Sequence, residues 1–77
     1  MTTDELRNCR DAVPFQPFTI HMADGRTFRV QHRDFMLISP TGRTIIVYTS
    51  GDVHSVLDTM LMTELSVEAV PAASAIT

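Results

Sequence analysis

The 77-residue chain has no lysine and no tryptophan, and it has one cysteine and one tyrosine. Because Cys9 is the single cysteine, no disulfide can form within the chain, which suits a reducing compartment. No apolar run approaches the roughly 18 residues of a membrane-spanning helix; the longest clear run is Ile-Ile-Val-Tyr at 45–48. The amino terminus has neither the basic start nor the apolar block of a signal peptide. These absences predict a soluble, cytoplasmic protein without a membrane partner.

Other absences argue against common catalytic and binding sites. The three glycines are isolated, so no glycine-rich loop could cradle a phosphate. The histidines do not have the spacing of a compact metal motif: they are His21, His32 and His54. Without tryptophan the chain can hardly build the aromatic groove that binds proline-rich peptides. So small a domain also leaves little room for a ligand cleft of roughly 300 Å³ or more. We therefore expect no enzymatic activity and no catalytic, cofactor or metal site.

The composition is that of one small folded domain. It is 44% hydrophobic and 19% charged, with a net charge of −3. This is too apolar for a disordered chain and too acidic for a dedicated nucleic-acid-binding protein. A chain of this size buries only about 60% of its unfolded-state surface, so a partner or oligomer could add to its stability. We expect a single domain over residues 2–68, followed by a small, uncharged and flexible tail at 69–77.

The first predicted element is a short amphipathic helix over about residues 3–12. Thr2 and Glu5 have the spacing of a capping box, in which each side chain bonds the other's backbone N–H. Pro14 and Pro17 end the helix, because proline lacks the N–H that a helix interior needs. The apolar residues at helical spacing form the predicted inner face: Leu6, Cys9 and Val13.

From Phe18 the apolar residues alternate with polar ones, which predicts a β-hairpin around Gly25. A two-residue loop would pair apolar residues with polar ones. A three-residue loop instead pairs Ile20 with Phe28 and Phe18 with Val30, which keeps each face uniform. Gly25 is then the left-handed residue of a type I turn with a bulge.

The remaining sequence predicts further strands joined by tight turns. In order, the segments are strand 35–38, turn 39–42, strand 44–48, turn 49–52, strand 53–56, a bend or helical turn at 57–59 and strand 60–67. In the last strand, Leu61 and Leu65 are expected on one face and Met62 on the other. The predicted fold is mainly β: an N-terminal helix and a five-stranded antiparallel meander closed into a small Src-homology-3-like or Sm-like barrel.

Residues 14–30, with the sequence PFQPFTIHMADGRTFRV, resemble the opening of a family of small uncharacterised bacterial proteins. Residues 39–44 and 63–67 are similar to later landmarks of that family, and the resemblance covers 2–68 without implying an activity. A shorter stretch, 22–26, is similar to part of the first motif of Sm-like RNA-binding proteins. The glycine of that motif after Arg26 is missing, so this similarity implies no RNA-binding residue in the chain.

Charge is distributed unevenly along the chain. Residues 15–43 hold four arginines and two aspartates, whereas 44–77 hold four acidic residues and no basic one. The candidate interaction surface consists of Arg26, Arg29, Arg33 and Arg43. We expect a non-enzymatic protein-interaction or self-associating module, whose arginines meet an acidic partner protein or the acidic last strand of a neighbour. The alternatives are an Sm-like barrel that binds RNA, and a solvated surface that binds nothing.

Overall fold

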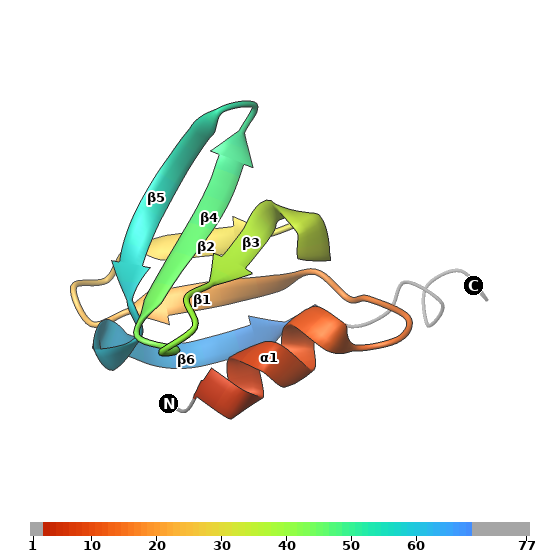
Figure 1. The fold of residues 1–77 in the computed structure, drawn as a ribbon, viewed down its shortest axis with the longest axis horizontal. Helices are drawn as coiled ribbons and strands as arrows, with labels where there is room; N and C mark the ends of the chain where they lie inside the picture. Colours follow the sequence, from red (N-terminus) through yellow and green to blue (C-terminus); the bar gives the residue numbers. More distant parts are fainter. Residues whose placement is uncertain (1–2, 69–77) are drawn as a thin grey trace.

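The computed structural model describes residues 3–68, which form a helix followed by six antiparallel strands in two small sheets (Figure 1). The elements are α1 (Thr3–Asp11), β1 (Phe18–Met22), β2 (Thr27–Val30), β3 (Met36–Ile38), β4 (Thr44–Ser50), β5 (Val53–Asp58) and β6 (Met62–Val67). Two short 3₁₀ helices, η1 (Arg33–Phe35) and η2 (Thr59–Leu61), join β2 to β3 and β5 to β6. The strand orders are β2-β1-β6 and β3-β4-β5. The prediction of a mainly β fold after an N-terminal helix is confirmed.

The helix α1 has nearly the predicted bounds and buries part of the predicted face. Leu6 is fully buried, and Cys9 packs half-buried against the core. Val13 is 87% exposed, so its predicted place on the inner face is wrong. The reason is that the helix ends at Asp11, ahead of the residue that precedes Pro14, where an α conformation is disfavoured. The predicted cap at residue 2 and the predicted tail at 69–77 lie outside the described residues.

The register of the first hairpin is confirmed. Phe18 pairs with Val30 and Ile20 with Phe28, as a three-residue loop requires. The backbone N–H of Met22 donates to the carbonyl of residue 26 at 2.9 Å, which closes that loop. Gly25 has a φ of +92°, a conformation open to glycine and costly for other residues. Alternation along the strands and one glycine were therefore sufficient to fix this pairing.

The predicted five-stranded meander is wrong in number and in connectivity. There are six strands among residues 3–68, and β1 pairs with the last strand, β6, as well as with β2. Those strands form two separate sheets and no closed barrel. The short helices η1 and η2 interrupt the chain of strands between β2 and β3 and between β5 and β6. Each has a local cause: the His32 side chain accepts the N–H of Asp34, and the Asp58 carboxylate accepts that of Met60. Both bonds favour a helical turn where a strand would otherwise continue.

The turn η2 also changes which side chains of the last strand face inward. Met62 is 5% exposed and belongs to the core, whereas Leu61 is 51% exposed. The prediction that Leu61 and Leu65 share one face and Met62 lies on the other is therefore wrong, because Leu65 packs against the same core as Met62. Because η2 ends at Leu61, β6 begins two residues later than predicted, and both Met62 and Leu65 face the core although they are three residues apart. A register shift between His21 and Met22 in β1 accommodates this pairing.

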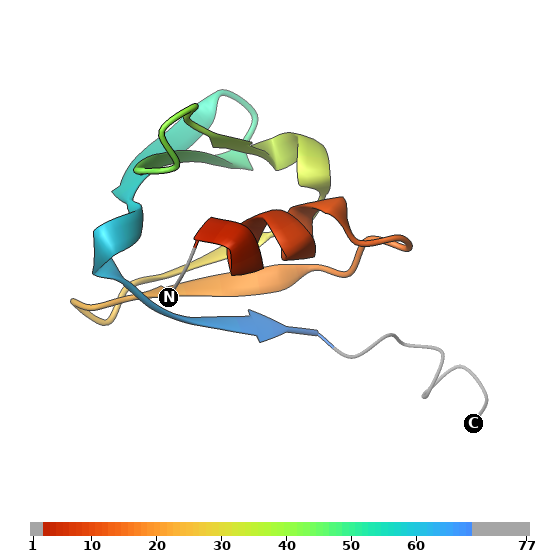
Figure 2. The same ribbon diagram turned by 60° about the horizontal axis from the view of Figure 1, so that its bottom comes forward.

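The core lies between the two sheets, and α1 closes one open side of this sandwich (Figure 2). Each sheet sends alternate side chains inward, since successive residues of a strand point to opposite faces. The buried apolar residues are Leu6, Phe18, Ile20, Met22, Val30, Met36, Ile45, Val47, Leu57 and Met62. The outward side chains of each sheet are the remaining alternate residues, and these differ sharply between the two sheets.

Candidate interaction surface

The outward face of the β2-β1-β6 sheet is polar, and its side chains bond one another. Nε2 of His21 lies 2.8 Å from Oγ of Ser66, which lies 3.4 Å from the Glu64 carboxylate. Next to them, the Arg29 guanidinium donates to the carboxylate of Glu68. The first three groups do not have the order of a catalytic triad, because serine rather than histidine occupies the middle position. They form a cross-strand polar network of the kind that stabilises a solvated sheet face.

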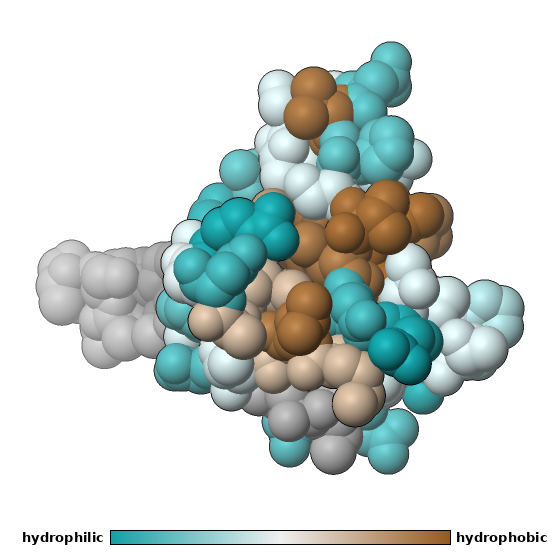
Figure 3. All heavy atoms as spheres, turned by 90° about the vertical axis from the view of Figure 1, so that its left-hand side faces the viewer, coloured by the Kyte–Doolittle hydropathy of each residue, from teal (hydrophilic) through white to brown (hydrophobic). Residues whose placement is uncertain are grey.

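The outward face of the β3-β4-β5 sheet carries an apolar row between polar residues, which include Thr44, His54 and Asp58. Leu37, Ile46 and Val56 are directly paired across the three strands, and we call these residues the apolar row. Leu37 is 55% exposed and Val56 is 63% exposed. Beside the row, Tyr48 pairs with His54, and their rings lie 5.3 Å apart. Figure 3 views the molecule from the side of β5 and η2 and shows apolar side chains gathered on that side between hydrophilic ones.

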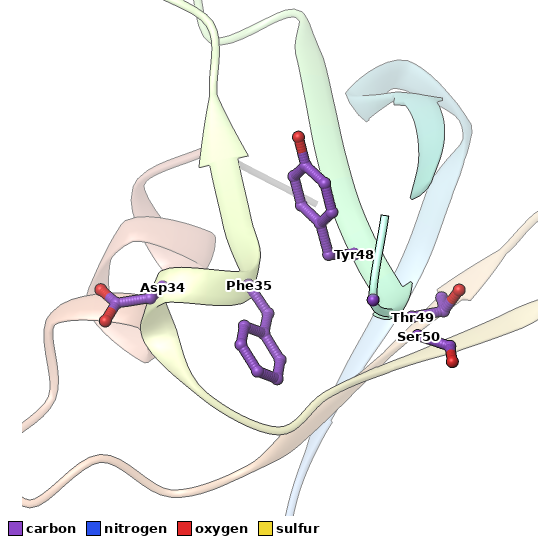
Figure 4. Close-up of a pocket in the computed structure, with 6 residues that line it drawn as sticks. Asp34, Phe35, Tyr48, Thr49 and Ser50 are labelled. Atoms are coloured by element: carbon purple, nitrogen blue, oxygen red, sulfur yellow. The ribbon is translucent and has the colours of Figure 1, made fainter. Parts of the chain in front are cut away.

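A hollow of about 310 Å³ lies between η1 and the end of the β4–β5 hairpin (Figure 4). It is lined by Asp34, Phe35, Tyr48, Thr49, Ser50 and Gly51. The sequence predicted little room for a cleft of this size, and the hollow is found where the β4–β5 hairpin projects beyond the core (Figure 1). Phe35 is 44% exposed. The Asp34 carboxylate points away from the hollow (Figure 4). The hollow therefore extends the apolar face and does not gather acid and base groups.

The four candidate arginines are dispersed over the fold. Arg26 lies in the β1–β2 turn, Arg29 on β2, Arg33 in η1 and Arg43 in the β3–β4 turn. Each has a partner within the chain. Arg26 donates to Asp24 at 2.7 Å. Arg33 donates to the carbonyl of Ala12 at 2.8 Å and lies over the ring of Phe15. The structure therefore does not bring these side chains together into one basic surface.

Two of the arginines bond acidic residues of the second half of the chain. Arg43 donates to Asp58 at 2.9 Å, and Arg29 donates to Glu68. These bonds hold the pKa of each carboxyl below its ordinary value, with a further contribution to Asp58 from the backbone N–H of Met60. Of the two acidic residues at the last strand, Glu68 is thus bonded to an arginine of the same chain, and Glu64 lies beside Ser66 instead.

Other groups of chemical interest are dispersed as well. Within residues 3–68, no three His, Cys, Asp or Glu side chains lie close enough to hold a metal ion. In the same range, no helix is long and apolar enough to cross a membrane. Burial raises the pKa of the Cys9 thiol, and the charge of Glu5 adds to this effect. The thiol is therefore less reactive than an exposed one at neutral pH.

Comparison with known proteins found no match. No family model matches the sequence, and neither a curated protein nor a solved structure matches it. The two sheets differ in their outward faces. One face is polar and its side chains bond one another, and the other carries the apolar row. The apolar row was missed from the sequence because its residues alternate with core residues within apolar strands. The signal that could have found it is the run at 45–48, which is apolar on both faces of one strand.

Proposed function

We propose that this protein is a non-enzymatic protein-interaction module that binds its partner through the outward face of the β3-β4-β5 sheet. The observation that supports the proposal is the apolar row, Leu37, Ile46 and Val56, on a face that this chain leaves uncovered within residues 3–68. An antiparallel sheet with one solvated face normally carries polar residues there. Contiguous exposed apolar residues bordered by polar ones are typical of a protein-binding surface.

Covering this face would supply part of the free energy of recognition. Complete burial of a leucine or valine side chain is worth about 1.5–3 kcal/mol. Leu37 and Val56 are each more than half exposed, so a partner that covered both would gain about 2 kcal/mol in total from them. Tyr48 lies beside the row, and tyrosine is one of the residue types enriched among the energetically dominant residues of protein interfaces.

The alternative function, RNA binding by an Sm-like barrel, has less support. It depends on arginines that are free to contact phosphates, and Arg26, Arg29, Arg33 and Arg43 all have partners within the chain. The return of the last strand to β1 is consistent with a distant likeness to Src-homology-3-like and Sm-like folds. Such a likeness concerns the fold and carries no site.

The experiment compares capture of partners by the wild-type protein and by the double variant Leu37→Thr, Val56→Thr. Threonine suits a strand. It replaces one methyl group of valine with a hydroxyl, and it replaces the isobutyl side chain of leucine with a shorter hydroxyethyl group. We expect the amount of each partner retained from a cell lysate, including further copies of the chain, to fall at least fivefold. Partner proteins are quantified by mass spectrometry, and circular dichroism melts confirm that the variant is folded.

The matched controls are Val13→Thr and Val67→Thr, which make the same kind of change at exposed positions outside the face. Val13 is 87% exposed and Val67 is 51% exposed. Both controls should retain partners as the wild type does. Equal retention by the double variant, or an equal loss in the controls, would contradict the proposed surface.

A further inference from the structure

The strand β5 is an unprotected edge of its sheet. Within residues 3–68 it pairs with β4 alone, and it is six residues long. Natural edge strands are usually kept from pairing with other chains by proline, lysine, an inward-pointing charge or a short length. The strand β5 has none of these, because its inward side chains are Val53, Ser55 and Leu57. Of the other edges, β2 and β3 are shorter, and β6 has the polar outward side chains Glu64 and Ser66, whereas β5 has the apolar Val56.

Exposed apolar side chains follow this edge along its length. Val53 and Val56 are each 63% exposed. Directly after β5, Met60 and Leu61 of η2 are 73% and 51% exposed. In Figure 3, which faces this side, apolar side chains lie at the upper end, near the middle and toward the lower end. A partner strand that ran antiparallel to β5 would lie beside Val53 and Val56, and its chain would end near Met60 and Leu61.

We propose that the partner is a second copy of the chain, whose β5 pairs antiparallel with this β5 across a two-fold axis at Val56. This inference goes beyond the proposed function, because it concerns the free edge of the β3-β4-β5 sheet and leaves the outward face of that sheet uncovered. In a continuous sheet, residues directly opposite each other must point to the same face. The two axes that meet this condition and use most of the strand pass through Ser55 or Val56.

Charge and apolar contact favour the axis at Val56. There, Val56 lies beside its own copy, and His54 lies opposite Asp58 of the second chain, a carboxylate that also accepts from Arg43 of its own chain. An axis at Ser55 would instead place Asp52 opposite Asp58 of the second chain and Val56 opposite His54. Like charges opposite each other destabilise a strand pair. The axis at Val56 also continues the apolar row into a line of six residues across six strands.

The antiparallel direction makes the two ends of the edge complementary. It places η2 of one copy beside the β4–β5 turn of the other, so that the exposed Met60 approaches the exposed Val53 twice in the dimer. A stable dimer buries about 800 Å² on each partner. One strand edge and four partly exposed apolar side chains supply less than this, so we expect a dimer that dissociates on dilution.

Disulfide trapping tests the axis. In a Cys9→Ser background, Val56→Cys should form an interchain disulfide, because directly opposite Cα atoms lie about 4.5–5.5 Å apart, within disulfide range. Val53→Cys is the matched control, since Val53 has the same exposure. Two copies of residue 53 would lie about 20 Å apart across this axis. We expect Val56→Cys to cross-link at least tenfold faster than Val53→Cys.

Sedimentation equilibrium from about 5 μM to about 500 μM should show a monomer–dimer equilibrium. A monomer throughout, with equal cross-linking of the two cysteine variants, would overturn the second copy as partner. The proposed function would survive that result if the double variant at Leu37 and Val56 still lost its captured partners. Rapid cross-linking of Ser55→Cys instead of Val56→Cys would overturn the assigned axis.

Discussion

Gly42 joins three parts of the fold, and replacing it with alanine should cost more stability than the same change at another glycine. It is buried in the β3–β4 turn with a φ of +77°. Its carbonyl accepts hydrogen bonds from Oγ1 of Thr3 and from Oγ1 of Thr59, each at 3.0 Å. The start of α1, the turn and η2 are therefore tied together at this one peptide.

The magnitude follows from two separate costs. A left-handed conformation costs an L-residue about 1–2 kcal/mol. In addition, a Cβ at position 42 would lie 3.1 Å from Cγ2 and 3.2 Å from Oγ1 of Thr3, so the helix start would have to shift. Overpacking of this kind adds about 1–2 kcal/mol. Gly51 also has a positive φ, +55°, but a Cβ there meets no atom within 4 Å. Gly51→Ala therefore has the backbone cost alone.

Thermal and urea denaturation measure the difference. At about 4–8 °C per kcal/mol for a domain of this size, Gly42→Ala should lower Tm by roughly 8–30 °C and Gly51→Ala by roughly 4–16 °C. Thr3→Ala removes both close atoms, so adding it to Gly42→Ala should recover about 1 kcal/mol, although it destabilises the wild type by loss of a hydrogen bond. Equal losses at the two glycines, or no recovery with Thr3→Ala, would refute the contact argument.

Two further predictions concern the sheet faces and the ion pairs. Ile45 is fully buried and Ile46 faces outward, so Ile45→Val should cost about 1 kcal/mol in urea denaturation and Ile46→Val less than half of that; equal costs would contradict the assigned faces. The hydrogen bond from Arg43, and to a smaller extent that from the N–H of Met60, lower the pKa of Asp58 from its ordinary 3.8. The ionised Asp58 therefore stabilises the fold fully above pH 3.8, and this stabilisation is lost as the pH falls through the lower pKa of the folded state. Urea midpoints of wild type and Asp58→Asn should therefore differ at neutral pH and converge in acid, and a constant difference would exclude this linkage.

Local features of the sequence predicted the local features of the fold. The bounds of α1 follow from two prolines, and the first hairpin follows from strict alternation around Gly25. These signals lie within a few residues of the structure that they determine. The turn at 39–42 is confirmed for the same reason: Gly42 has a positive φ, and its N–H donates to the carbonyl of Ser39 at 2.8 Å.

Features that depend on distant parts of the chain were not predictable in the same way. The pairing of β1 with β6 brings Glu68 beside Arg29, 39 residues earlier, so charges that are segregated in the sequence become neighbours in space. The division into two sheets depends on η1 and η2. Their side-chain caps, His32 and Asp58, stand two residues before the N–H that each accepts. That spacing is visible in the sequence but is common, and only the three-dimensional course of the strands shows that it interrupts the ladder.

The strands β1 and β4 are each the central strand of a three-stranded sheet, and their difference bears on function. In β1 the alternation is strict, and the outward residues Thr19 and His21 are polar. In β4, Ile45 and Val47 face the core while Ile46 and Tyr48 face outward, which is the pattern of a strand covered on both sides. Residues 3–68 cover β4 on one side only. Since the same chain places polar residues on the solvated face of β1, the apolar outward residues of β4 indicate a surface that a partner covers.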